Sequence, residues 1–213
     1  MKTHRLGTEG PLVSAIGLGC MQMSGAVGPH PGPDRDQDGI ATIRAALDAG
    51  INLLNTGDFY GMGHNEMLVG RALKGRREQA IISVKFGAQK SPSGAFLGFD
   101  SCSASIKNFA AYSLQRLGVD VIDIYQPARI AADVPIEETV GAIADLIQEG
   151  KVRFLGLSEA NAAQLQRAHA VHPVTALELP LRAEDLMLLE ETFADGAIRG
   201  DRQPPQFKHL VPN

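Results

Sequence analysis

The sequence predicts an α/β protein of the (β/α) TIM-barrel type, in which a parallel sheet is surrounded by outer helices. Short apolar runs typical of buried strands alternate with segments in which apolar residues recur at helical spacing. This alternation is typical of βα units. A doubly wound sheet also fits, but its nucleotide-binding form carries G-x-G-x-x-G after the first strand. Here Gly17-Leu18-Gly19-Cys20-Met21-Gln22 lacks the third glycine, which favours the barrel.

Each predicted strand is a short apolar run bounded by glycine or polar residues. The runs are Val13–Gly19, Ile51–Leu54, Ala80–Val84, Val121–Tyr125, Val152–Leu157 and Val174–Leu179. Ahead of the first run, Gly7 and Gly10-Pro11 are expected to form a small hairpin.

Helices are predicted between these strands from apolar spacing and from residues that favour helix starts and stops. The expected starts are Asp34 or Asp36, Asn65, Ser103, Pro135 and Asn161. The expected stops are Gly50, Gly75, Gly118 and Gly150. A last helix is expected around Leu186, Leu189 and Phe193.

The alternation supplies about six of the eight strands that a closed barrel needs. One domain is expected over residues 1–195, cut short after about residue 179, followed by an irregular tail rich in proline and polar residues over 196–213. Open strand edges favour association with a second copy. An internal deletion, two chains completing each other, and an open sheet covered by the C-terminal segment all fit, and we favour the deletion.

Composition excludes several classes of partner. The chain is 44% hydrophobic and 21% charged, with a net charge of -4 and no element rich in lysine and arginine, so nucleic acid is not expected. No apolar run approaches the ~20 residues of a membrane span. The N-terminus lacks a secretory signal, and the two cysteines, Cys20 and Cys102, suit a reducing cytoplasm.

Polar residues follow the apolar runs at the predicted strand ends, where a barrel carries its chemistry. Asn55, Asp58 and Tyr60 follow the second strand, and Ser158 follows the fifth. Lys85 comes directly after the run IISV, so its amine is expected where the strands converge. A lysine that extends to solvent at the barrel rim fits the same pattern.

Several motifs occur in an order that resembles the aldo-keto reductases. They are GLGCM, TGDFYG with NE and GRAL after it, VKFG, IDIYQPAR and GKVRFLGLSEA. The resemblance covers residues 1 to about 179 and is closest to bacterial members with QPAR or RPAR after the fourth strand. It implies a barrel that binds NADP(H) in an extended form, and hydride transfer between that cofactor and a small aldehyde or ketone.

The resemblance also implies the catalytic residues. Tyr60 is expected to be the general acid and Lys85 the ammonium that lowers the pKa of its phenol. Asn55 stands at the family's aspartate position, where it can accept a hydrogen bond from Lys85 without supplying charge. Ala128 stands in the substrate pocket at the histidine position and cannot donate to a carbonyl.

Met21, Asn55, Ser158 and Glu159 are the cofactor-binding residues that the resemblance implies, with Ser158 bonding the nicotinamide carboxamide. Asp58 could take the place of the lost aspartate, and His64 could reach the carbonyl or simply lie in the turn. No metal site is expected, because His169 and His172 lack a third ligand nearby. The retained Tyr60 and Lys85 favour an enzyme, whereas Asn55 and Ala128 favour a non-catalytic regulatory or interaction protein on the same scaffold.

Overall fold

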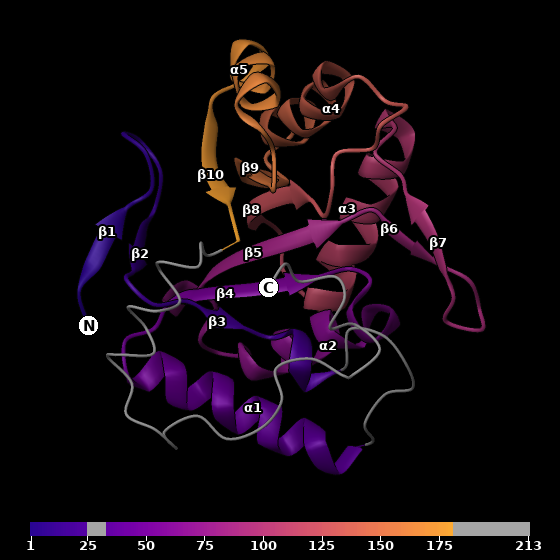
Figure 1. Cartoon of the computed structure of the whole chain (residues 1–213). Coiled ribbons are helices and arrows are strands. Elements are labelled where there is room, and N and C mark those ends of the chain that lie inside the picture. The colour runs from indigo at the N-terminus through magenta and orange to yellow at the C-terminus, as the bar shows by residue number, and fades with distance from the viewer. Residues whose placement is uncertain (25–32, 181–213) are drawn as a thin grey trace. The chain divides into compact units, whose positions relative to one another are not determined.

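A computed structural model describes residues 1–24 and 33–180 (Figure 1). The chain divides into two compact units, Met1–Glu178 and Leu179–Asn213, and the fold described here is that of the first. Its centre is a six-stranded parallel sheet with the strand order β10-β9-β8-β5-β4-β3. The strands are β3 (Leu18–Gly19), β4 (Leu53–Gly57), β5 (Ile81–Phe86), β8 (Ile122–Pro127), β9 (Val152–Ser158) and β10 (Val174–Glu178).

A helix lies between every two successive strands of this sheet, so the described chain is built of βα units (Figure 1). The helices are α1 (Pro33–Asp48), α2 (His64–Ala72), α3 (Ser103–Leu117), α4 (Ile136–Gln148) and α5 (Ala162–Val171). Within the described residues β3 and β10 are the sheet edges, so this is an incomplete TIM-type barrel, as the sequence predicts.

The core lies between the strands and the inward faces of the helices. β8 is buried at every position, which is typical of a strand in a parallel sheet with both faces covered. Fully buried Ile43, Leu68, Ile106 and Ile143 come from α1, α2, α3 and α4 in turn. Each such side chain contributes about 1.5–3 kcal/mol of transfer free energy. The helical spacing of apolar residues therefore marks the faces that hold the helices on the sheet.

The first predicted strand is wrong as a single element, because the chain leaves one sheet and joins another within it. β2 (Leu12–Ser14) pairs antiparallel with β1 (Thr3–Arg5), which confirms the predicted hairpin. The side-chain amide oxygen of Asn52 accepts from the Ser14 amide at 2.7 Å, and Ile16 is exposed. The parallel sheet receives only the short β3 from this run.

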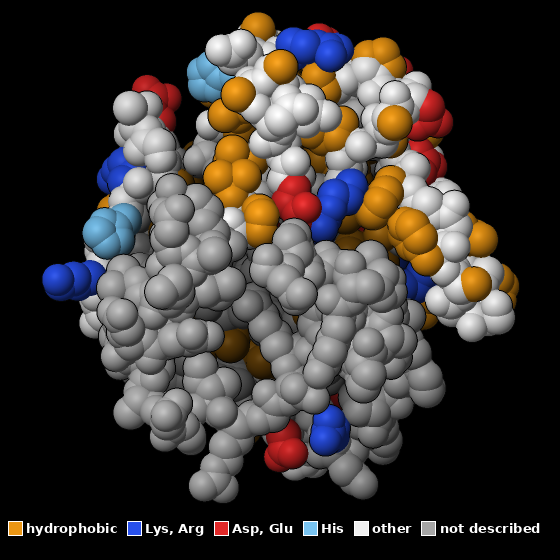
Figure 2. Space-filling view, in the orientation of Figure 1, with side chains coloured by type: hydrophobic (Ala, Val, Ile, Leu, Met, Phe, Trp, Pro, Cys, Tyr) orange, Lys and Arg blue, Asp and Glu red, His pale blue; other side chains and the backbone are white. Residues whose placement is uncertain are grey.

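A second hairpin, β6 (Ala88–Lys90) with β7 (Phe96–Phe99), follows β5 and is absent from the sequence prediction. Gly87 begins it at a φ of 90°, and a side-chain carbon there would lie 2.4 Å from the carbonyl oxygen of Asp100. Phe96 and Phe99 pack edge to face with ring centroids 5.1 Å apart and are both exposed. Figure 2 shows hydrophobic side chains gathered over this hairpin.

The predicted helix ends hold in several places and fail at Asn65. Asn161 caps α5 in a capping box with Gln164, and Gly118 ends α3 at a φ of 66°. α2 instead begins after Gly63, so Asn65 lies inside the helix, fully buried. Asp34 and Asp36 both lie inside α1. The helix predicted around Leu186–Phe193 and the tail over 196–213 lie outside the described residues.

Candidate functional site

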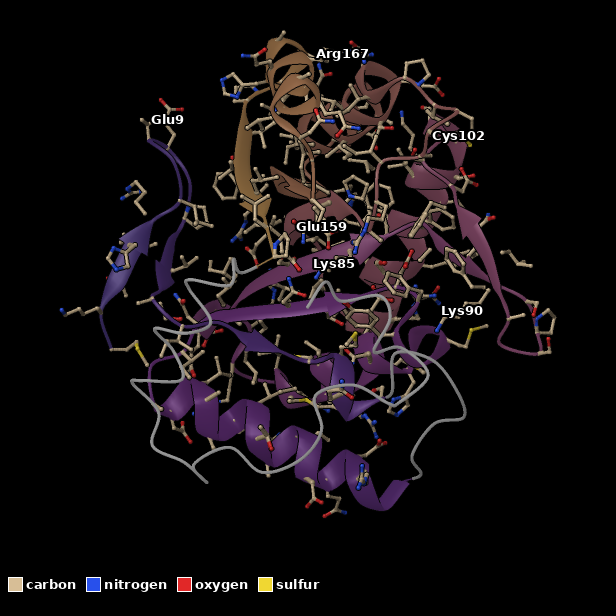
Figure 3. All side chains as sticks on the ribbon, viewed as in Figure 1. Glu9, Lys85, Lys90, Cys102, Glu159 and Arg167 are labelled. Atoms are coloured by element: carbon tan, nitrogen blue, oxygen red, sulfur yellow. The ribbon has the colours of Figure 1, made fainter. Side chains whose placement is uncertain are left out.

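The carboxyl ends of the parallel strands bring the predicted polar residues to one edge of the sheet. In the strand register, Gly57 of β4 lies opposite Lys85 of β5, and Lys85 lies opposite Gln126 of β8. Ser158, the last residue of β9, lies opposite Glu178, the last residue of β10. Figure 3 shows the labelled Lys85 and Glu159 near each other in the centre of the view.

Lys85 is held at this edge by two partners. It is 7% exposed, and its Nζ donates to Oδ1 of Asn55 at 2.7 Å, the contact that the sequence predicts. Its second partner is the carboxylate of Glu178, with Nζ 2.8 Å from Oε2. The ammonium is thus satisfied by one amide and one carboxylate, as a buried charge requires.

Glu178 is a site residue that the sequence prediction missed. Its Oε2 also accepts from Nδ2 of Asn55 at 3.1 Å and from Nε2 of Gln126 at 3.0 Å. The sequence carries a signal for it, because a lone carboxylate ends the apolar run VTALE. That signal does not indicate that the ion-pair partner of Glu178 is Lys85, which lies on β5, three strands from β10 in the sheet order.

Tyr60 lies beside this cluster, in the 3₁₀ turn Tyr60–Gly63 that follows β4. It is 5% exposed, and its ring packs edge to face on Phe59 with centroids 4.7 Å apart. A side-chain carbon at Gly57 would lie 3.3 Å from the Tyr60 ring, so the ring covers the residue opposite Lys85. The Tyr60 phenol therefore lies within reach of the charge of Glu178, which is the ion-pair partner of Lys85, and no hydrogen bond joins the Tyr60 and Lys85 side chains.

The predicted lowering of the Tyr60 pKa is not what the surroundings produce. Burial raises the pKa of the Tyr60 phenol, and the negative charge of Glu178 raises it further. The Arg129 guanidinium acts in the opposite direction. The phenol is consequently protonated throughout the neutral range, which is the form an acid catalyst needs.

Ser158 and Glu159 end β9 in contrasting surroundings. Ser158 is 1% exposed, and its Oγ has no hydrogen-bond partner among the described residues. An unsatisfied buried hydroxyl costs about 1–3 kcal/mol, so this group suits a ligand with a polar atom. Glu159 has a φ of 54°, which non-glycine residues seldom adopt, and its carboxylate lies 2.6 Å from Arg129 Nη2.

Met21 and Ala128 follow the carboxyl ends of β3 and β8, which are separated in the sheet by β4 and β5. Met21 opens the 3₁₀ turn Met21–Met23 that follows β3 and is partly buried. Ala128 directly follows β8, is 2% exposed and donates its amide to the Phe86 carbonyl at 2.8 Å. At this position the chain offers a methyl group and no side-chain hydrogen-bond donor.

Asp58 does not take the place of the lost aspartate. Its Oδ2 accepts from the Gly87 amide at 3.2 Å, and its Oδ1 is buried without a partner in the described part of the chain. Burial and the neighbouring charge of Glu66 raise the pKa of Asp58 to about 7, against the effect of the Gly87 hydrogen bond.

His64 is engaged with α1 and with the segment that follows β3. Its Nδ1 lies 2.7 Å from Ser24 Oγ, and its Nε2 lies 3.0 Å from Asp36 Oδ1. Ser24 is fully buried and also accepts from the Asn65 amide, so a substrate cannot reach it as a nucleophile. We assign this Ser–His–Asp arrangement to packing between α1 and α2.

Three other features bear on the kind of protein. Among residues 1–24 and 33–180 there is no group of three or more histidine, cysteine or acidic side chains placed to hold a metal ion. In the same ranges no helix has the length and apolar character to cross a membrane. Cys20 and Cys102 are both free thiols, and burial raises the pKa of Cys20 to about 12.

Comparison with known proteins gives consistent relatives. A curated soybean (Glycine max) protein named probable aldo-keto reductase 1 is 42% identical over 176 residues, which are 82% of this chain and 50% of that protein. A solved glycerol dehydrogenase from Gluconobacter oxydans is 34% identical with a TM-score of 0.76, covering 84% of this chain and 55% of its own.

An aldo-keto reductase from Klebsiella pneumoniae, solved in complex with NADPH, is 28% identical with a TM-score of 0.64, covering 78% of this chain and 53% of its own. The chain thus spans about half the length of the relatives it matches. The aldo/keto reductase family model matches residues 15–184. Taken with the incomplete six-stranded barrel, called the half-barrel below, and with the soybean relative, this match shows that the chain belongs to the aldo-keto reductase family.

Proposed function

We propose that this chain is an NADP(H)-dependent oxidoreductase that transfers hydride between the cofactor and the carbonyl carbon of a small aldehyde or ketone. The single observation that carries the proposal is the Ser158 hydroxyl, which has no partner among the described residues and lies at the same edge of the sheet as Lys85. Support comes from family membership and from the Klebsiella relative that was solved with NADPH. We extend the proposal to a reducing, cytoplasmic setting, which the two free thiols suit.

The residues at the carboxyl ends of the strands, around Lys85 and Ser158, form what we call the mouth of the half-barrel. They fit the nicotinamide end of such a cofactor. A carboxamide supplies both a donor and an acceptor, and the Ser158 hydroxyl can pair with either. The carboxylate of Glu159 lies at the adjacent position but is already paired with Arg129. Ser158 is therefore the group in this chain that we expect to hold the carboxamide.

When bound, the cofactor would supply the hydride that adds to the carbonyl carbon. Tyr60 would then deliver its phenolic proton to the former carbonyl oxygen, so that one O–H bond breaks and another forms. The phenolate that remains would lie near the positive charge of Arg129 until solvent returns a proton. Ala128 adds no donor to the carbonyl, so proton delivery rests on Tyr60.

Fluorescence titration with NADPH tests the cofactor assignment. We expect saturable binding to the wild type and ~5–10-fold weaker binding to Ser158→Ala, which is the loss of about one hydrogen bond. Because this hydroxyl is buried without a hydrogen-bond partner among the described residues, Ser158→Ala removes a desolvation cost and should unfold at a urea concentration no lower than that of the wild type. Ser93→Ala, an exposed serine in the turn between β6 and β7, is the matched control. Absence of saturable NADPH binding to the wild type would rule out the proposed function.

The second candidate is a non-catalytic regulatory or interaction protein on the same scaffold. It is favoured by Asn55 and Ala128, which replace two of the side chains that the family uses, and by the burial that makes Tyr60 a weak acid. This candidate predicts that the protein reduces no carbonyl compound, whether or not it binds NADPH. Turnover with a panel of small aldehydes and ketones separates the two.

A further inference from the structure

We propose that Glu178 is a positioning residue whose carboxylate, held by the amides of Asn55 and Gln126, fixes the Lys85 ammonium at the mouth of the half-barrel. The inference rests on the proposed function, since Glu178 can position Lys85 for catalysis only if the chain catalyses a reaction. In this account the negative charge that pairs with Lys85 comes from Glu178 at the end of β10, because Asn55 carries no charge.

The ion pair is the first step of the argument. Lys85 is nearly fully buried, and removing an ammonium from water is costly unless an anion pairs with it. Within residues 1–24 and 33–180, Glu178 is the carboxylate that forms an ion pair with Lys85, at 2.8 Å. The orientation of Lys85 therefore depends on a residue from the sixth strand of the sheet.

The second step is the orientation of Asn55. Its Oδ1 faces the ammonium of Lys85 and its Nδ2 faces Oε2 of Glu178. The reversed amide would set an NH2 group against the ammonium, so the contacts themselves fix the assignment. An aspartate here could not donate to Glu178 and would repel it. Asn55 and Glu178 are thus a matched pair, one neutral and one charged.

The third step is the support for Glu178 from β8. Gln126 is 2% exposed and donates to Oε2 at 3.0 Å. Gly156 of β9 leaves room for it, because a side-chain carbon there would lie 2.8 Å from Oε1 of Gln126. Two amides from different strands therefore converge on one carboxylate oxygen, which makes its position specific although the Glu178 side chain is 42% exposed.

Nuclear magnetic resonance of ¹⁵N-labelled lysine ammonium groups tests the pairing without cofactor or substrate. We expect a slowly exchanging Lys85 resonance in the wild type, identified by its loss in Lys85→Arg. Glu178→Gln keeps the shape and an acceptor but removes the charge, and should accelerate exchange at least ~5-fold. The double variant Asn55→Asp/Glu178→Gln returns a carboxylate to Lys85 and should restore the slow exchange. Glu137→Gln, at a glutamate of α4 whose carboxylate pairs with Arg167, should leave the Lys85 resonance unchanged.

The same variants test the role in turnover. Glu178→Gln should lower kcat by ~10–100-fold through misplacement of Lys85, with NADPH affinity near the wild-type value. The double variant should recover most of kcat, whereas Asn55→Asp alone should lower it, because it sets two carboxylates together.

Each outcome has a distinct meaning. A Lys85 resonance unchanged by Glu178→Gln overturns the inference, whatever the turnover. Faster exchange with unaltered kcat overturns the positioning role. Faster exchange in a protein that binds no NADPH upholds the pairing while the proposed function fails, so the two proposals can fail separately.

Discussion

The carboxyl group of Asp58 lies directly after β4 in surroundings that disfavour its charge. Its Oδ1 is buried and has no hydrogen bond to any residue that the structure describes, and burial together with Glu66 raises the pKa of Asp58 to about 7. The folded state therefore holds a proton on Asp58 that the unfolded chain releases near pH 4. Stability from this group is fully present below about pH 4 and is lost as the pH rises to about 7.

We predict that Asp58→Asn is more stable than the wild type by ~2–4 kcal/mol at pH 8 and that the gain vanishes near pH 4, because about three pKa units correspond to about 4 kcal/mol at most. Urea unfolding at several pH values measures this. Asp133→Asn, an exposed aspartate, is the control and should show no such trend. A pH-independent difference between Asp58→Asn and wild type would contradict the assignment.

At the scale of single residues, the sequence identifies candidate site residues from their residue type and from their position after a predicted strand. Tyr60, Lys85 and Asn55 do come to one edge, and the Lys85–Asn55 bond is confirmed. Glu178 escapes prediction because its contact with Asn55 spans 123 positions. The Tyr60 pKa escapes as well, because burial and the charge of Glu178 depend on packing that no local motif encodes.

At the scale of elements, the amino end of β8 is tied to its neighbours by one buried carboxylate. Asp123 is fully buried and accepts from Arg77 at 2.6 Å, from Arg153 at 2.7 Å and from the Ile82 amide at 2.8 Å. It thus joins β8 to β5, to β9 and to the 3₁₀ turn Arg77–Gln79. This is the end of the strand opposite the candidate site.

We predict that Asp123→Ala costs about 3–5 kcal/mol, because it leaves buried donors without their anion. Urea unfolding measures the loss, and hydrogen exchange should accelerate at the Ile82 amide. Asp120→Ala, an exposed aspartate just before β8, should cost at most about 0.5 kcal/mol. If the two substitutions lowered the free energy of unfolding equally, the hydrogen bonds and ion pairs of Asp123 would not be what stabilises this end of β8.

Prediction of the elements follows the strength of their local signals. β5, β8 and β9 are continuous apolar runs between helical segments, so they are found near their observed bounds. β3 has two residues, too few to separate from β2 by composition. The β6–β7 hairpin contains serine, proline and glycine in its turn and has exposed strands, so it reads as a loop. Asn65 has the residue type of a cap, but Gly63 supplies the left-handed conformation at the helix start.

At the scale of the whole unit Met1–Glu178, the site exists because the sheet is curved. β4 and β10 are separated by β5, β8 and β9, which in a flat sheet would place them about 19 Å apart at ~4.8 Å per strand. The side chains of Asn55 and Glu178 nevertheless meet at 3.1 Å. The half-barrel therefore closes the mouth around Lys85 even though β3 and β10 are edges within the described residues.

The transfer of deuterium from NADPH labelled at C4 tests the central claim most directly, because it follows the hydride itself. We predict that the wild type places deuterium from one face of the nicotinamide on the carbinol carbon of the alcohol product, as read by mass spectrometry. Tyr60→Phe should do so at least ~10²-fold more slowly, whereas Tyr112→Phe, an exposed tyrosine on α3, should match the wild type. Alcohol without deuterium at that carbon, no alcohol at saturating NADPH, or equal rates in Tyr60→Phe and wild type would contradict the account.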